Sequence, residues 1–270
     1  MPAQQVIALS THETDKIRLV NIPPQETEQL KDAIRQAVAR AWPAGVQREQ
    51  VYGGCPEFKI KGTPFWAGGA DTIHVRQLMM QIIEALGARG YQAIASCDIS
   101  KKEHDSDTIF FVRTGVAQPP VARVAVMLAM TDTIRLIGGS PELQQVFQAA
   151  VQSRWSKPPQ KIEQYHGSLS IKLKGTPWWS NGVEAVESRA CVCHVLAELA
   201  RVRSQAIEKI YDRTCFLRSV VIPVRVGARA DLRSLTEAHR QIHFLPEAAE
   251  QRATRRDLAG GSSPVVHLVQ

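Results

Sequence analysis

The chain has 270 residues, of which 44% are hydrophobic and 22% are charged, which is typical of a soluble globular protein and excludes wholesale disorder. The formal net charge is +7 at pH 7, so anionic partners are compatible with the chain, although its basic residues are spread out rather than gathered in one run. The sequence contains no run of 18 consecutive apolar residues, so its pattern does not predict a transmembrane helix.

The pattern of residues 1–116 predicts six elements in chain order: a strand, a helix, a strand, a helix and two further strands. The first strand lies near Lys16–Val20. The first helix has apolar residues at i, i+3, i+4, i+7 and i+8, which predicts one stripe facing a core, namely Leu30, Ala33, Ile34, Ala37 and Val38. The second helix carries Met79, Ile82, Ile83 and Leu86, and the last two strands lie near Tyr91–Asp98 and Thr108–Arg113.

Residues 117–227 predict the same order of elements. The first strand falls near Val124–Ile137, a length that leaves open a preceding strand or a bend, and Ser140-Pro141-Glu142 is typical of a helix start. The two helices repeat the apolar stripes as Leu143, Val146, Phe147, Ala150, Val151 and as Val192, Val195, Leu196, Leu199. Strands are expected near Gln205–Tyr211 and Phe216–Val226. Residues 228–270 predict a helix at Asp231–His243 and a loose tail.

An internal repeat accounts for this symmetry. The segment KIKGTPFW at 59–66 returns as KLKGTPWW at 172–179, an offset of 172 − 59 = 113. The same offset pairs Trp42 with Trp155 and Tyr52 with Tyr165, while the strand before the first helix matches at an offset of 117. The sequence therefore predicts a tandem duplication, with copy one at 1–116, copy two at 117–227 and a C-terminal segment at 228–270.

The predicted fold class is α+β. Each copy is expected to form a strand-helix-strand-helix-strand-strand unit, with a mixed sheet and helices packed on one face. The pattern leaves open whether the two sheets stay separate or join edge to edge.

The two KGTP segments are the most specific feature. Residues two apart in a strand share a face, so Lys59 and Lys61 are expected on one side of the strand, opposite Phe58 and Ile60. The functional hypothesis is a surface that binds an anionic ligand or a protein partner, built from Lys59, Lys61, Trp66, Arg76, Lys172, Lys174, Trp178, Trp179 and Arg189. The alternative is structural: the lysines lie on an exposed strand face and protect an edge of the sheet, and Trp66 and Trp179 belong to the core.

Two other groups of residues favour structural interpretations. Cys191, Cys193 and His194 spread around a helix, and copy one has Leu78, Met80 and Gln81 in their places, so no metal site is expected. Cys97-Asp98 followed by His104-Asp105 could bring a thiol near an imidazole, but copy two has Ile210 and Tyr211 in place of Cys97 and Asp98. We therefore expect no catalytic residues and no cofactor.

The leading hypothesis is a non-enzymatic binding or adaptor protein with two pseudo-equivalent basic faces. A nucleic-acid-binding protein is the first alternative, with Trp178 or Trp179 stacking on bases, and an enzyme with a cleft between the copies is the second. The start of the chain lacks the pattern of a signal peptide, and its five cysteines form no disulfide framework. A reduced, cytoplasmic protein without membrane insertion is expected.

Overall fold

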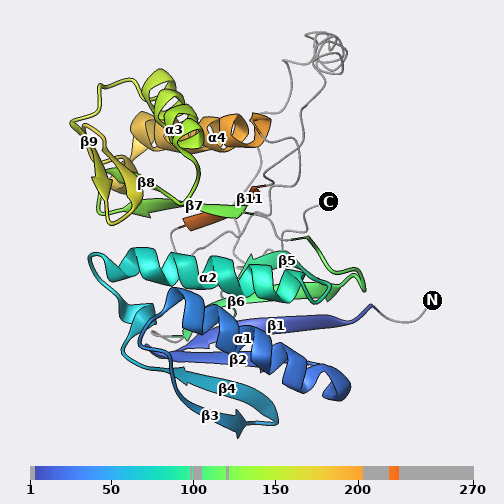
Figure 1. Ribbon diagram of the computed structural model, residues 1–270. Helices are drawn as coiled ribbons and strands as arrows, with labels where there is room; N and C mark the ends of the chain where they lie inside the picture. The colour runs from blue at the N-terminus through green and yellow to red at the C-terminus, as the bar shows by residue number, and fades with distance from the viewer. Residues whose placement is uncertain (1–3, 98, 100–104, 120–121, 203–218, 225–270) are drawn as a thin grey trace, which may run out of the picture. The chain divides into compact units, whose positions relative to one another are not determined.

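The computed structural model describes residues 4–97, 99, 105–119, 122–202 and 219–224. Within these ranges the chain forms an α+β fold with two antiparallel sheets and four α-helices (Figure 1). The segments expected to form a strand at 205–211 and a helix at Asp231–His243 lie outside the described residues, as does the whole of 228–270.

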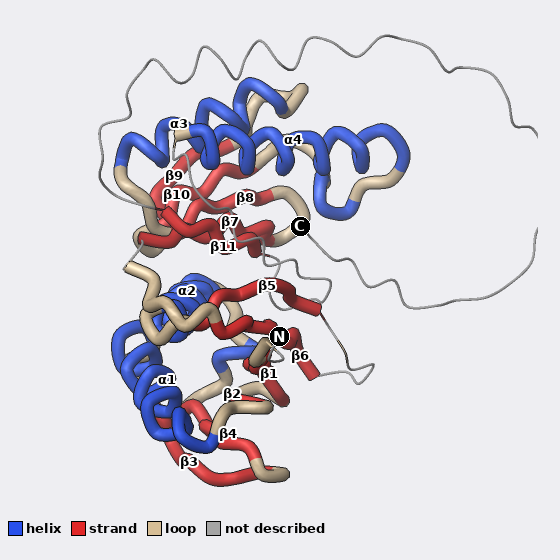
Figure 2. Tube along the Cα trace, turned by 90° about the vertical axis from the view of Figure 1, so that its right-hand side faces the viewer, coloured by secondary structure: helices blue, strands red, loops and turns tan. Residues whose placement is uncertain are grey.

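The first sheet has six strands in the order β3-β4-β2-β1-β6-β5. Their bounds are β1 Val6–His12, β2 Lys16–Val20, β3 Val46–Tyr52, β4 Cys55–Ile60, β5 Tyr91–Cys97 and β6 Asp105–Arg113. Helix α1 (Thr27–Ala41) follows β2, and α2 (Asp71–Gly87) follows β4. Both helices lie on one face of this sheet (Figure 2).

The second sheet has five described strands in the order β11-β7-β8-β10-β9. Their bounds are β7 Ala122–Ala129, β8 Thr133–Ile137, β9 Lys161–Tyr165, β10 Ser168–Lys172 and β11 Ser219–Val224. Helices α3 (Pro141–Arg154) and α4 (Gly182–Arg201) lie together on one face of this sheet (Figure 2). The sheet's order matches the first sheet strand for strand, with β9, β10, β8, β7 and β11 in the places of β3, β4, β2, β1 and β6.

The sheets correct two expectations from the sequence. The expected mixed sheets are antiparallel in every described pairing. Short turns require this direction where they join β1 to β2, β3 to β4, β7 to β8 and β9 to β10, whereas the other pairs join segments that are farther apart in the chain. The expected single strand before the second helix is a β-hairpin, and a further strand, β1, precedes the first expected one. Strand β3 was missed because six of its seven residues are exposed, so it lacks the alternating apolar pattern of a half-buried strand.

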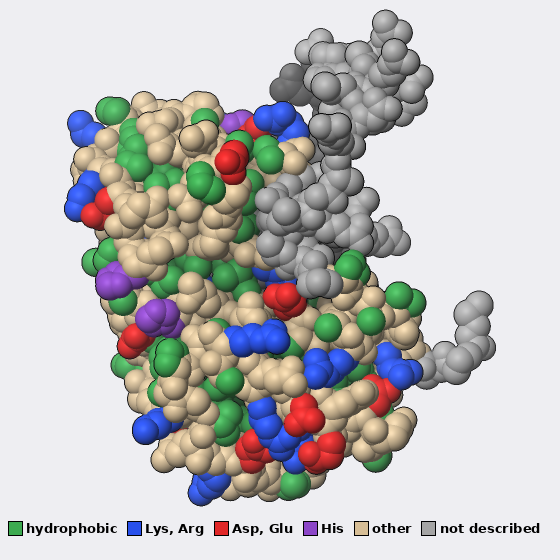
Figure 3. Space-filling view, in the orientation of Figure 1, with side chains coloured by type: hydrophobic (Ala, Val, Ile, Leu, Met, Phe, Trp, Pro, Cys, Tyr) green, Lys and Arg blue, Asp and Glu red, His purple; other side chains and the backbone are tan. Residues whose placement is uncertain are grey.

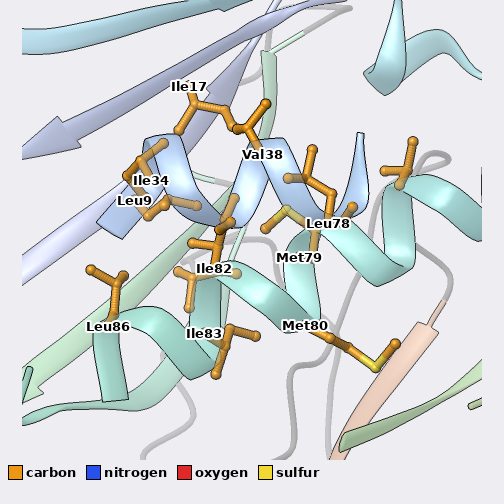
Figure 4. Close-up of a cluster of buried hydrophobic side chains, with 14 of the residues drawn as sticks. Leu9, Ile17, Ile34, Val38, Leu78, Met79, Met80, Ile82, Ile83 and Leu86 are labelled. Atoms are coloured by element: carbon orange, nitrogen blue, oxygen red, sulfur yellow. The ribbon is translucent and has the colours of Figure 1, made fainter. Parts of the chain in front are cut away.

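The apolar stripe of α1 is confirmed, since all five of its predicted residues are at most 1% exposed. The start of α3 is also confirmed: the Ser140 hydroxyl accepts a hydrogen bond from the Leu143 backbone N–H at 3.4 Å. Figure 4 shows how α1 and α2 side chains, including Ile34, Val38 and Leu78, pack with Leu9 and Ile17 of the sheet.

Each sheet has its own buried cluster, and the first cluster continues beyond its own strands. It includes Ala125, Met127, Ala129 and Ile137, which belong to β7 and β8. These residues alternate with Val124, Val126, Ile134 and Leu136, which pack in the second cluster. The second sheet therefore has apolar residues on both faces, as expected for a sheet that is packed on both sides.

Candidate functional site

Each KGTP segment is a turn between a strand and a short 3₁₀-helix, which covers Pro64–Trp66 in copy one and Pro177–Trp179 in copy two. The turn passes through Gly62 and Gly175, whose φ angles are +91° and +99°. Residues with a Cβ rarely adopt this region, so glycine is the residue that lets the chain reverse here. The two turns therefore share one backbone conformation.

Backbone hydrogen bonds fix the turn of copy one to the β1–β2 hairpin. The N–H of Ile60 donates to the Asp15 carbonyl at 2.7 Å, and the N–H of Phe65 donates to the Thr14 carbonyl at 2.9 Å. The indole N–H of Trp42, at the end of α1, donates to the Lys61 carbonyl at 2.8 Å. Two backbone hydrogen bonds to the hairpin and one hydrogen bond from a tryptophan side chain of the helix end therefore fix the conformation of this short segment.

The turn of copy two is fixed in the same way. The N–H of Leu173 donates to the Asp132 carbonyl at 2.8 Å, and the N–H of Trp178 donates to the Thr131 carbonyl at 3.1 Å. The indole N–H of Trp155 donates to the Lys174 carbonyl at 3.3 Å. Each contact falls at the position that the offsets of 113 and 117 assign, so the repeated residues make the same structural contacts.

The tryptophans that these turns carry differ in exposure. Trp66 is 53% exposed and Trp179 is 74% exposed, so neither belongs to the core. Trp178 is half-buried, and its indole N–H donates to the Thr133 carbonyl at 2.9 Å. The structural alternative for Trp66 and Trp179, that both are core residues, is thus wrong, while Trp178 packs against the second core.

The four lysines divide into two pairs. The Nζ atom of Lys59 lies 3.6 Å from Asp15 Oδ2, and that of Lys172 lies 3.7 Å from Asp132 Oδ2, so both join an ion pair beside the turn. Lys61 and Lys174 are exposed and follow the ends of β4 and β10. In each KGTP segment it is therefore the second lysine, Lys61 or Lys174, that is exposed in the same turn as the exposed tryptophan.

The two arginines proposed with these lysines do not share one environment. Arg76 is 5% exposed, and its Nη1 lies 3.4 Å from the Thr72 carbonyl, so the surface of copy one does not include it. Arg189 is exposed and donates to the Ala185 carbonyl at 2.7 Å. In the view of Figure 3, basic side chains are interspersed with acidic ones, and no continuous basic face is visible there among the described residues.

A second repeated cluster, not predicted as a site, lies on the sheet face away from the helices. In copy one the Arg18 guanidinium lies 4.0 Å from the Tyr52 ring centre and pairs with Glu57 at 2.6 Å. In copy two Arg135 lies 4.3 Å from the Tyr165 ring centre. The signal was present in the sequence, because the offsets of 117 and 113 align the two arginines and the two tyrosines.

Glu57 is the buried acid of this cluster, with an exposed fraction of 1%. Burial raises the pKa of its carboxyl, but hydrogen bonds from Arg18 and Gln50 outweigh burial and hold the pKa below the ordinary value of 4.5. Copy two has Ser170 in this position, which accepts from Arg135 at 3.2 Å. The buried carboxylate of the cluster is thus specific to copy one.

The residues considered for metal binding and catalysis lie apart or outside the described ranges. Cys191 is buried, and its burial raises the pKa of the thiol to about 11, whereas Cys193 is exposed. Across the described ranges, no group of three or more His, Cys, Asp or Glu side chains is placed to hold a metal ion. Cys97 ends β5 and is exposed; Asp98 and His104 are not among the described residues.

One further polar pair, Ser10 and His12, lies on β1. The Ser10 hydroxyl is 2.8 Å from His12 Nε2, and Ser10 itself is 5% exposed. Copy two has Met127 and Ala129 at these places, both buried.

None of the helices in the described part of the chain is long and apolar enough to cross a membrane.

The fold and the repeated turns define an α+β protein with two antiparallel sheets, each carrying a glycine turn that presents an exposed tryptophan. A domain-family model matches residues 5–112 and 123–204, which together exceed half of the chain. The chain belongs to that domain family.

Comparison with individual proteins adds little to this assignment. No curated protein matches the chain. Among solved structures, the chain is similar to a conserved kinetoplastid-specific protein from Trypanosoma cruzi, with 18% sequence identity and a TM-score of 0.29. That match covers 42% of this chain and 99% of the other. At this score the likeness establishes neither fold nor function.

Proposed function

We propose that the chain is a tandem duplication, with copy one at 1–116 and copy two at 117–227. Support comes from the matching order of five strands in the two sheets and from the repeated hydrogen bonds of the two KGTP turns. The repeating unit is strand-strand-helix-strand-strand-helix followed by a further strand or strands. Duplication gives one chain two related surfaces, which suits a partner with two contact points.

We further propose that the protein is a non-catalytic binding or adaptor protein whose contacts are the KGTP turns. The observation that carries this proposal is the exposure of Trp66 and Trp179 at the same place in both copies. Tryptophan is among the residues most often responsible for binding energy in protein interfaces. Hydrogen bonds already fix the turn that carries each exposed indole, so binding a partner there would cost little additional backbone entropy.

The chemistry of the turns favours a partner with apolar and acidic groups together. Lys61 and Lys174 are exposed in the same segments as the two indoles, so each turn offers an apolar surface and a cation. A protein segment with an apolar side chain near a carboxylate, or an anionic ligand with an apolar part, matches this pair. The ion pairs at Lys59 and Lys172 assign these two residues to the support of the turn.

The proposal is tested by changing Trp66 and Trp179 to Ala, singly and together, and by quantifying the proteins and small anions recovered with the purified chain. We expect each single change to reduce recovery of a partner and the double change to abolish it. Val51→Ala is the matched control, because Val51 is an apolar residue that is 75% exposed outside the turns. If the double variant retains its fold by circular dichroism and recovers every partner at the wild-type level, the proposal is wrong.

Nucleic acid is the second candidate, favoured by the 74% exposure of Trp179. Bases stack on exposed aromatic rings, and binding through lysines weakens steeply as salt rises. Titration of the chain with mixed single-stranded oligonucleotides, followed by tryptophan fluorescence at low and high salt, distinguishes the two candidates. Salt-sensitive quenching that the Trp179→Ala change removes would favour nucleic acid, and the absence of quenching would exclude it.

A further inference from the structure

The hairpin that holds each KGTP turn has a different side chain at its tip in the two copies. This residue is Glu13 in copy one and Met130 in copy two, as the offset of 117 assigns. Both have a left-handed backbone, which is uncommon outside glycine, with φ angles of +53° and +54°. The two hairpin tips therefore share one backbone conformation and differ in the chemistry that they present beside the turn.

The hairpin tip of copy one is charged. The Glu13 carboxylate accepts a hydrogen bond from the Lys16 ammonium and forms an ion pair with it, and the Glu13 side chain is 59% exposed. A partner that packs over this tip would remove water from a carboxylate, which costs free energy unless the partner supplies a polar group. Charge therefore surrounds the approach to Trp66.

The hairpin tip of copy two is apolar. Both members of the ion pair are replaced, Glu13 by Met130 and Lys16 by Thr133. Met130 is 78% exposed. Methionine is flexible and polarizable, and it is frequent on surfaces that bind the apolar side chains of partners. The tip of copy two is thus suited to an apolar contact that the tip of copy one disfavours.

Met130 lies close to the exposed indole of its own copy. The N–H of Trp178 donates to the Thr131 carbonyl at 3.1 Å, and Met130 and Trp179 are the chain neighbours of the two bonded residues. The short helix that ends at Trp179 lies close to α4, and Val183 in the first turn of α4 is 76% exposed. We call Met130, Trp179 and Val183 the apolar patch of copy two.

The charge beside the patch favours one class of partner. Lys174 is exposed in the same turn and forms no ion pair within the described part of the chain, whereas Lys172 pairs with Asp132. A nucleic acid would need several cations along its phosphates. One cation beside three apolar side chains instead matches a protein segment that has a large apolar side chain next to a carboxylate.

We propose that the apolar patch of copy two and Lys174 bind such a protein segment, and that the turn of copy one does not bind it. The apolar side chain of the segment covers Met130 and Trp179, and its carboxylate pairs with Lys174. This inference rests on the proposed binding function of the KGTP turns and assigns different specificities to the two copies.

Selection of random peptides displayed on phage, with the full chain as bait, tests this specificity. We expect the enriched peptides to share a large apolar residue close to Asp or Glu. A synthetic peptide of the enriched sequence is then titrated against the chain by calorimetry. One peptide is expected to bind per chain, although the chain has two KGTP turns.

Exchange of the two tip residues tests the role of the hairpin. Met130→Glu is expected to raise the dissociation constant of the peptide by about tenfold or more, because the peptide would cover a carboxylate. Glu13→Met is the matched control and is expected to leave it unchanged. Each variant takes the residue that the other copy holds at a nearly equal φ angle, so the backbone accepts both changes.

Several results overturn the proposal: no enrichment of such peptides, two bound peptides per chain, or equal affinity of Met130→Glu and the wild type. If Trp179→Ala abolishes peptide binding while Met130→Glu does not weaken it, only this inference fails and binding by the turn stands. If neither Trp66→Ala nor Trp179→Ala weakens binding of the peptide, the proposed function of the KGTP turns fails as well.

Discussion

Replacing Tyr91 with Phe removes one oxygen from a buried hydrogen-bonded group. Tyr91 is 1% exposed, and its hydroxyl donates to Glu26 Oε2 at 2.6 Å. The second carboxylate oxygen of Glu26 lies 2.5 Å from Arg113 Nη2, and Glu26 is 6% exposed. Burial and the hydrogen bond to Glu26 both raise the pKa of Tyr91, so the hydroxyl stays protonated as the donor.

The expected loss of stability follows from the charge and burial of the acceptor. A hydrogen bond to a charged group contributes about 1.5–3 kcal/mol, and a buried acceptor left without its donor also loses the solvation that water would give. Arg113 still neutralises the carboxylate in the variant, which limits the cost. We therefore expect Tyr91→Phe to lower the free energy of unfolding by about 2 kcal/mol.

Urea unfolding followed by circular dichroism measures this difference. Tyr52→Phe is the matched control, because it removes the same atom from a tyrosine that is 54% exposed. The control is expected to change stability by less than about 0.5 kcal/mol. If Tyr91→Phe costs no more than Tyr52→Phe, the hydroxyl of Tyr91 does not support the buried carboxylate, and the reasoning is refuted.

Three further predictions concern the repeated framework. The folded-state pKa of Glu57 lies below 4.5, so its contribution to stability is present above pH 4.5 and is lost as the pH falls through the folded-state pKa. Glu57→Gln is therefore expected to make the free energy of unfolding fall less steeply as the pH is lowered below 4.5. An unchanged pH profile in urea titrations would contradict this expectation. Gly62→Ala and Gly175→Ala are both expected to lower the melting temperature, because φ is positive at both positions. Gly175→Ala is expected to lower it more, because its Cβ would lie 2.6 Å from Glu184 Oε1 and would push this side chain away from Lys157, whereas that of Gly62 would meet nothing nearer than Trp42 at 3.7 Å. Equal melting temperatures would refute the ordering. Ser140→Ala is expected to cost about 1 kcal/mol in urea unfolding by removing the cap of α3. Gln145→Ala, at an exposed position of the same helix, is its control, and equal costs for the two variants would contradict the capping role.

The four helices in the described part of the chain were predictable from the sequence, and the sheets were predictable only in part. Leu30, Ile34 and Val38 recur at helical spacing, and this pattern is local. Strand β3 gives no such signal, because its residues from Gln47 to Tyr52 are exposed and no face is set by burial. The direction of strand pairing depends on contacts between segments far apart in the chain, which periodicity does not record.

For the candidate site, the sequence identified the KGTP turns but not the roles of their residues. The strand rule assigned Lys59 and Lys61 to one face, whereas the structure gives Lys59 an ion pair with Asp15 and leaves Lys61 exposed beyond the strand. Arg76 and Arg189 are equivalent by offset, yet one is buried and the other exposed. The burial of a side chain depends on which surfaces pack together in three dimensions, and a constant offset in the sequence does not contain this information.

The sequence by itself determined that one pattern of residues occurs twice and that its tryptophans, glycines and helix stripes recur at constant offsets. These features are local, so the chain alone carries them. Only the tertiary structure decided the role of each tryptophan. Trp42 and Trp155 donate hydrogen bonds to the turns, whereas Trp66 and Trp179 are exposed to solvent. The sequence does not give these roles, because they depend on hydrogen bonds and packing between residues that are distant in the chain.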